Sequence, residues 1–126
     1  MLTAINPEGI AAVPFYSQGV EAKGASRQLY ISGQVGVADD GSVPESLAEQ
    51  TRLAIGNLNK VLAGAGMEPE NLAKITIYLT DENRIGEFMQ AGVGAVTGTP
   101  PATTLLIVKA LAAPNLLVEI EGIAVA

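Results

Sequence analysis

The stretch Leu116-Leu117-Val118-Glu119-Ile120-Glu121-Gly122-Ile123-Ala124-Val125 closes the chain and decides how its fold is interpreted. Its composition is typical of a β-strand, and residues 103–111 just before it have the same character. Both strands are apolar on their two sides, whereas the helices expected elsewhere cover only one face of a sheet. An uncovered apolar sheet face promotes self-association. We therefore expect a homo-oligomer in which sheets of different subunits pack together.

The segments before these two strands predict the rest of a mixed sheet. Two short strands are expected at residues 18–23 and 28–35, on either side of a turn at Gly24-Ala25-Ser26. A further strand is expected at residues 72–80, where apolar and polar residues alternate. The short link Ala112-Ala113-Pro114-Asn115 predicts that the last two strands form an antiparallel hairpin.

Two helices are expected between the strands. Ser42-Val43-Pro44-Glu45 has the pattern of a capping box, which predicts a long helix with Ser42 at its N-cap and its end near residue 65. A shorter, glycine-rich helix is expected over residues 84–95. The order β-β-α-β-α-β-β predicts an α+β fold with both helices on one face of the sheet, in a single domain of residues 1–126.

Composition excludes several classes of function. The 126 residues include 13 acidic and 7 basic side chains, and the net charge of -6 repels a nucleic-acid backbone. Cysteine and histidine are both absent, which excludes disulfides, thiolate nucleophiles, Cys/His zinc sites and Ser-His-Asp triads. We therefore expect no metal or cofactor and no nucleic-acid partner.

The chain carries no pattern of a membrane protein or a secreted one. It has no run of 18 apolar residues. Its first residues lack the basic and apolar regions of a signal peptide. The expectation is a cytoplasmic protein without a membrane partner.

Glu119 and Glu121 are the first candidates for chemistry. They are two residues apart on a strand, so they lie on one face at a separation of about 7 Å. Paired carboxylates in apolar surroundings take up protons more readily than solvated ones, and such groups donate protons or position water. The alternative interpretation is a pair of solvated glutamates on an edge strand, partnered by Lys109.

Three further segments have both a functional and a structural interpretation. Tyr16 offers a phenol to a substrate atom, or it packs its ring on the core. Ser32-Gly33 lets a ligand approach the backbone closely, or it forms a bulge that ends a strand. Residues 91–98 contain GxGxxxG at a spacing that does not match a dinucleotide fingerprint, and we interpret them as a flexible helix end.

The order and spacing of several motifs resemble the YjgF/Rid family of small trimeric imine/enamine deaminases. The resemblance covers almost the whole chain and rests on these segments: Phe15-Tyr16-Ser17-Gln18, Tyr30-Ile31-Ser32-Gly33-Gln34-Val35, Asn57-Leu58, Ile75-Thr76-Ile77-Tyr78-Leu79-Thr80-Asp81, Pro101-Ala102-Thr103 and Val118-Glu119-Ile120-Glu121-Gly122-Ile123-Ala124.

The resemblance implies a chorismate-mutase-like subunit, a homotrimer around a central barrel, and a cleft at each interface that holds a small-molecule substrate. It implies Glu119 as the catalytic residue that positions the attacking water. It also implies a substrate-binding set on the cleft, with no role for Glu121. That set is Tyr16, Ser32, Gly33, Thr103 and Thr104.

The sequence departs from the family pattern at position 103, and its second helix and the following loop are shorter than in that pattern. In the family an arginine follows the Pro-Ala of the penultimate strand and clamps the substrate carboxylate, whereas Thr103 stands there in this chain. A hydroxyl cannot replace the charge of a guanidinium. Arg27, Arg52 or Arg84 could reach the cleft from a neighbouring subunit, or each lies on a solvated surface.

Two functions remain open from the sequence. The first is a hydrolase that deaminates a small imine, enamine or related amide, with an atypical substrate because Thr103 replaces the arginine. The second is a small-molecule-binding or regulatory trimer without catalysis. An endoribonuclease role fits poorly with the negative charge and the absence of histidine.

Overall fold

The computed structural model describes residues 1–11, 13–95 and 97–126. The elements follow in the order β1 (Leu2–Ile5), β2 (Gly19–Ala22), β3 (Gln28–Val35), α1 (Leu47–Gly64), η1 (Pro69–Asn71), β4 (Leu72–Leu79), η2 (Glu82–Arg84), α2 (Ile85–Ala91), β5 (Ala102–Ile107) and β6 (Val118–Val125). This is the expected α+β arrangement, with one additional strand, β1, at the beginning.

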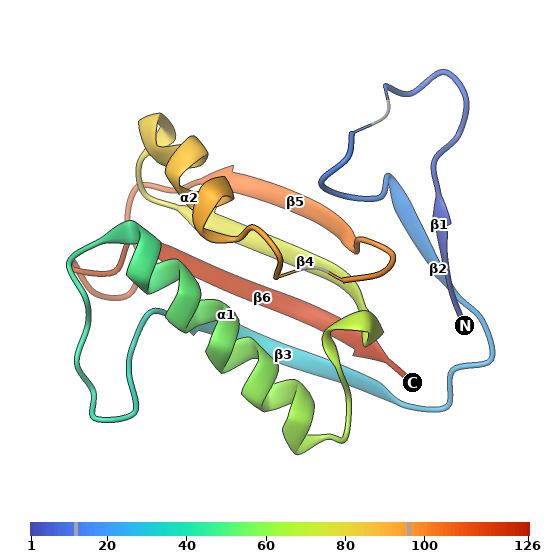
Figure 1. Ribbon diagram of the computed structural model, residues 1–126, viewed down its shortest axis with the longest axis horizontal. Coiled ribbons are helices and arrows are strands. Elements are labelled where there is room, and N and C mark those ends of the chain that lie inside the picture. The colour runs from blue at the N-terminus through green and yellow to red at the C-terminus, as the bar shows by residue number, and fades with distance from the viewer. Residues whose placement is uncertain (12, 96) are drawn as a thin grey trace.

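Four strands form the main sheet in the order β3-β6-β4-β5. β6 lies at the centre and pairs antiparallel with both β3 and β4, while β5 pairs parallel with β4 at the edge. Both helices cover the same face of this sheet (Figure 1), as the sequence predicted. β1 and β2 form a separate antiparallel hairpin that stands beside the sheet.

The core lies between the helices and the sheet. α1 buries Leu47, Ala54, Leu58 and Leu62 against the strands. Each buried aliphatic side chain of this size contributes roughly 1.5–3 kcal/mol relative to an exposed one. Aromatic side chains are few, so aliphatic packing supplies most of the apolar stabilisation.

The expected hairpin between the last two strands is wrong. β5 ends at Ile107, earlier than predicted, so residues 108–117 form a longer connection that carries the chain past β4. β6 then enters between β3 and β4, where its residues Val118, Ile120 and Ala124 are buried. β6 occupies the centre of the sheet because a central position buries the apolar residues on the helix side of this strand more completely than an edge position would. β6 is therefore not an edge strand either.

The predicted start of the long helix is also wrong. Ser42 donates its hydroxyl to Asp40 at 2.6 Å and its amide to the same oxygen at 2.9 Å, which forms a turn. Its hydrogen bond to Asp40 lowers the pKa of that carboxyl. The helix begins four residues later, where the Ser46 hydroxyl accepts a hydrogen bond from the Glu49 amide at 3.0 Å. Ser46-Leu47-Ala48-Glu49 is itself a capping-box pattern.

Two other predictions need smaller corrections. Strand β2 does not pair with β3 across Gly24-Ala25-Ser26 but pairs with β1, which the sequence did not suggest. α2 ends at Ala91, before the predicted end at residue 95. Within the glycine-rich segment 91–98, Val96 lies outside the described residues. Across the described ranges, no helix combines the length and apolar character needed to cross a membrane.

Candidate functional site

Glu119 and Glu121 share the sheet face that is turned away from the helices. In the register of the sheet, Glu119 lies beside Tyr78 and Glu121 beside Thr76. We call this the open face; it carries Tyr30, Ser32, Lys74, Thr76, Tyr78, Thr104, Leu106, Glu119, Glu121 and Ile123. The two carboxylates therefore have polar as well as apolar neighbours, so the expected apolar company is only partly correct.

The carboxylate of Glu119 is held against the backbone of β3. The pairing of β3 with β6 shifts register between Ile31 and Gln34, so Ser32 and Gly33 form the predicted bulge. At Gly33 a methyl group would overlap the Glu119 carboxylate, because the side chain packs directly on the glycine. The structure thus brings together three predicted site residues, Ser32, Gly33 and Glu119, and a side chain at Gly33 would separate them.

Tyr78 adds a phenol to this group. Its hydroxyl donates a hydrogen bond to Glu121 Oε1. The pKa of Tyr78 is raised, mainly by this hydrogen bond to Glu121 and also by burial and the nearby negative charges of Glu121 and Glu119. The sequence contained the signal for this neighbour, since Tyr78 alternates with Ile77 and Leu79 in the predicted strand.

A hollow of about 410 Å³ lies on the open face beside this group. Its lining includes Ser32, Lys74, Glu121 and the exposed ring of Tyr30. Lys74 donates to the hydroxyl of Thr104 at 2.7 Å, so Thr104 also belongs to this face.

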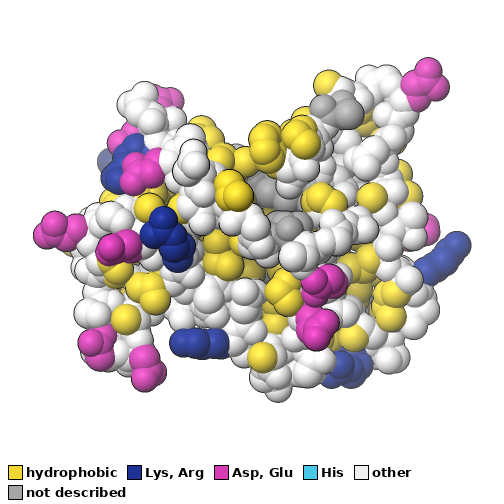
Figure 2. Space-filling model, in the orientation of Figure 1, with side chains coloured by type: hydrophobic (Ala, Val, Ile, Leu, Met, Phe, Trp, Pro, Cys, Tyr) yellow, Lys and Arg dark blue, Asp and Glu magenta, His cyan; other side chains and the backbone are white. Residues whose placement is uncertain are grey.

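Thr103 and Tyr16 lie on the opposite side of the sheet. Thr103 pairs with Ile75, whose face packs against the helices, and both residues line a cavity of about 780 Å³ that also includes Tyr16. The lining of this helix-side cavity comes from α1, η1, β4, α2, β5 and β6, from the segment 14–16 and from residues between α2 and β5. Figure 2 shows the hollow, with apolar side chains gathered around it. Within one chain, Glu119 and Thr103 cannot face the same ligand.

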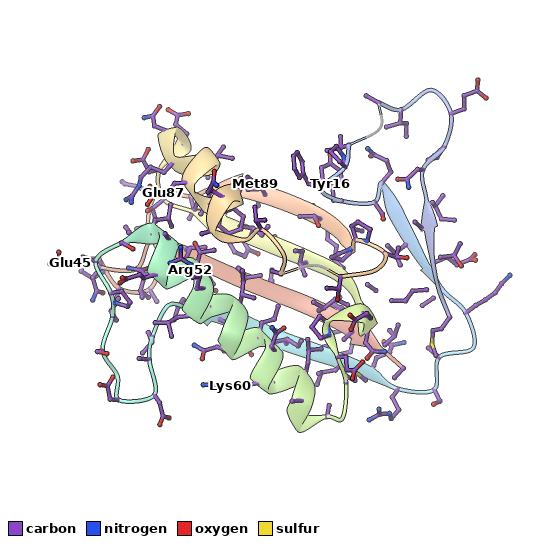
Figure 3. The ribbon with its side chains drawn as sticks, in the orientation of Figure 1. Tyr16, Glu45, Arg52, Lys60, Glu87 and Met89 are labelled. Carbon is purple, nitrogen blue, oxygen red and sulfur yellow. The ribbon has the colours of Figure 1, made fainter. Side chains whose placement is uncertain are left out.

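Two backbone contacts position Tyr16 beside the start of β5. Ser17 pairs with Ala102 in a parallel bridge, and its amide donates to the Pro101 carbonyl at 3.2 Å. The hydroxyl of buried Ser17 donates to the Pro100 carbonyl at 2.6 Å. Figure 3 shows Tyr16 on one side of the cavity and Met89 of α2 on the other.

The three candidate arginines are placed outside both hollows. Arg27 donates to the Ala65 carbonyl at the end of α1, at 2.9 Å. Arg84 pairs with Glu87 at 2.9 Å, and this contact raises the pKa of Arg84 and lowers that of Glu87. Arg52 is exposed on α1 (Figure 3). None of the three lines either hollow described above.

Over the described ranges, no group of three or more acidic, histidine or cysteine side chains is arranged to hold a metal ion. The side chains around the two hollows carry carboxylate, phenol, hydroxyl, amide and ammonium groups. Glu119 can exchange a proton with water, and Tyr16 and Thr103 can form hydrogen bonds to a polar group.

These features define a small α+β protein with a carboxylate on one sheet face and a ligand-sized cavity on the other. Comparisons with known proteins identify its family. The family model described as Endoribonuclease L-PSP matches residues 7–126. The chain is 37% identical over 117 residues to the mouse 2-iminobutanoate/2-iminopropanoate deaminase, covering 91% of this chain and 84% of the relative. It is 35% identical over 122 residues to a RutC family protein of Aquifex aeolicus, covering 94% of each chain.

Solved structures give the same result. YyfB of Yersinia pestis, described as a protein of unknown function of the conserved Rid family, superimposes with a TM-score of 0.89 at 32% identity, over 99% of this chain and 98% of that one. A putative endoribonuclease L-PSP from Entamoeba histolytica superimposes with a TM-score of 0.74 at 30% identity over the full length of both chains. The chain therefore belongs to the YjgF/Rid family.

Proposed function

We propose that this protein is a hydrolase that deaminates a small imine, enamine or related amide and releases ammonia. The observation that carries the proposal is the carboxylate of Glu119, which packs against the bulged backbone at Gly33 and so has a defined position. The names of relatives such as the mouse deaminase support this reaction class.

The proposed site lies between two copies of the chain. Glu119, Ser32 and Gly33 would come from the open face of one subunit, and Tyr16 and Thr103 from the cavity of another, because one chain holds these groups on opposite faces. A homotrimer with a cleft at each interface, as the family resemblance implies, would supply such a pairing. The assembly itself is part of the proposal.

The proposed reaction needs only a carboxylate and water. Water adds to the carbon of the C=N bond, and Glu119 takes a proton from the water and passes it to the nitrogen. A second proton follows from the added hydroxyl as the C–N bond breaks, which leaves a carbonyl product and ammonia. Thr103 would hold a polar group of the substrate through hydrogen bonds rather than through charge, so we propose a substrate without the usual carboxylate.

Hydrolysis of imines generated in the assay tests the proposal. An amino-acid oxidase produces imino acids in place, and the matching amine oxidase produces imines without a carboxylate. We expect faster decay of the second group with the wild-type protein and a loss of about 100-fold or more in Glu119→Gln. Glu121→Gln is the matched control, since it removes the neighbouring charge on the same face. No acceleration with either group, or equal losses in both variants, would contradict the proposal.

Thr103→Arg restores the guanidinium that the family pattern carries at this position. We expect this variant to gain hydrolysis of imino acids relative to uncharged imines. A folded variant with the same oligomeric state and no gain would show that the cleft differs by more than this one residue.

One observation favours the second candidate function, a binding protein without catalysis. The described lining of the helix-side cavity contains no charged side chain. A thermal-shift screen with oxo acids, amides and amines separates the two functions, because a non-catalytic binder shows stabilisation by a ligand without any hydrolysis.

A further inference from the structure

The helix-side cavity has the size and chemistry of a ligand site. Its volume of about 780 Å³ falls within the range of small-molecule pockets, which are lined mostly by apolar groups with a few polar ones. Here the walls are aliphatic or aromatic from both helices and the sheet, including Ile55, Leu58, Phe88 and Met89.

Few of the residues that line the cavity have polar side chains. Thr103 and Tyr16 both lie near the start of β5. Tyr16 is placed there because the neighbouring Ser17 donates hydrogen bonds to the carbonyls of Pro100 and Pro101. The Thr103 hydroxyl donates to the Pro101 carbonyl at 3.1 Å, which leaves its oxygen free to accept from a ligand N–H. The Tyr16 phenol can donate to a ligand oxygen or nitrogen. Asn59 of α1 is the other polar side chain of the described lining, so the cavity is a largely apolar space with a few polar groups.

Charge argues against an anionic ligand. Lys, Arg, Asp and Glu are absent from the described lining, and Arg27 and Arg84 are bonded elsewhere. Glu70, next to the lining residue Pro69, accepts a hydrogen bond from Thr97 that lowers the pKa of its carboxyl, so negative charge stands near the cavity. Burying an unpaired charge in such a place is costly.

We propose that this cavity selects an uncharged molecule with an aromatic or branched aliphatic body and one polar head that both donates and accepts a hydrogen bond. The inference rests on the proposed function, since it names the substrate class of the same site. It excludes small oxo and imino acids as the preferred ligands. It is tested by binding alone, so that it stands or falls separately from hydrolysis.

Two fluorescent probes with one skeleton measure the selectivity. N-phenyl-1-naphthylamine is uncharged and carries an N–H, and 1-anilinonaphthalene-8-sulfonate adds a sulfonate to the same rings. We expect the uncharged probe to bind at least about tenfold more tightly to the wild-type protein, because the sulfonate would be buried without a partner. Equal affinities, tighter binding of the sulfonate, or no binding of the uncharged probe would overturn the proposal.

Charge variants locate the binding. Thr103→Arg adds a cation to the cavity and should lower the preference for the uncharged probe about tenfold or more. Ala110→Arg, on the exposed connection after β5, adds the same charge outside the cavity and should leave the preference unchanged. Equal effects of the two variants would overturn the proposal.

A further variant keeps the test decisive. If Thr103→Arg does not fold, Met89→Glu places a charge on the apolar wall of the cavity. This variant should bind the uncharged probe about tenfold more weakly, and an unchanged affinity would contradict the proposal. Selectivity for the uncharged probe in a protein that hydrolyses no imine would support the proposed ligand class and refute the proposed reaction. Hydrolysis of imines without this selectivity would support the reaction and refute the ligand class.

Discussion

Replacing Gly33 with alanine tests whether the packing of Glu119 on β3 sets the position of its carboxylate. The new Cβ would stand 2.8 Å from Glu119 Cγ, where ordinary contacts are 3.4–4 Å, and closer still to the carboxylate. Cγ must then retreat by at least 0.6 Å (3.4 Å less 2.8 Å), and the carboxylate beyond it must move farther.

The expected effect separates activity from stability. A misplacement of about 1 Å can cost about 100-fold in rate, so we expect a loss of that order in the hydrolysis of an imine that the wild-type protein accepts. The moving atoms belong to the end of a flexible side chain, and alanine in a strand gains about 0.5–1 kcal/mol over glycine. The free energy of unfolding should therefore change by less than about 1 kcal/mol.

The assay pairs initial rates with urea denaturation. Gly56→Ala in α1 is the matched control, because nothing lies within 4 Å of its added methyl group. That variant should keep its activity and gain up to about 1 kcal/mol of stability. A folded Gly33→Ala with the wild-type rate would refute the reasoning. A destabilisation above about 3 kcal/mol would show that Glu119 cannot move aside.

Three further predictions concern the scaffold. Gly36→Ala should lower the free energy of unfolding by about 1–3 kcal/mol in urea, because its Cβ would lie 2.5 Å from a backbone atom of α1; an unchanged midpoint would contradict that packing. Ser46→Ala should lower the free energy of unfolding by about 1 kcal/mol, and Ser42→Ala should lower it by clearly less. The reverse order would show that Ser42 is the N-cap and would contradict the structure. In an ultraviolet pH titration, Tyr78 should ionise above the ordinary tyrosine pKa of 10.0. The contribution of neutral Tyr78 to the stability of the fold is therefore complete below pH 10.0 and is lost as the pH rises through the folded-state pKa. Tyr78→Phe should remove this ionisation at high pH, and Glu121→Gln should lower the pH at which it occurs. An ionisation at high pH that persists in Tyr78→Phe would belong to another tyrosine and would contradict the prediction.

Local patterns in the sequence predicted the elements well. Alternation identified β4, helical spacing identified α1, and the glycine after Ser32 indicated the bulge in β3. These signals depend on neighbours in the chain, so they need no tertiary context. The wrong N-cap at Ser42 had the same local origin, because Ser42 and Ser46 are each followed three residues later by a glutamate. In the structure Ser42 is hydrogen-bonded to Asp40 in a turn, and Ser46 caps the helix.

The arrangement of the strands could not be predicted from the same signals. The short link after β5 suggested a hairpin, yet β6 lies between β3 and β4. Strand order depends on which long-range pairing buries the most apolar surface, and a sequence pattern does not specify the partner. β1 was missed because Leu2-Thr3-Ala4-Ile5 does not alternate apolar and polar residues in the sequence, although the exposure of the four side chains alternates in the structure.

The sequence by itself determined that Glu119 and Glu121 share one face, because side chains alternate along a strand. It also determined the negative charge, the lack of histidine and cysteine, and the threonine at position 103. Only the tertiary structure decided that Glu119 rests on Gly33 and lies beside Tyr78, and that Thr103 faces the helix-side cavity on the opposite side of the sheet. The physical reason is that these relations are set by the pairing register of strands far apart in the chain, where a shift of one residue would exchange the two faces.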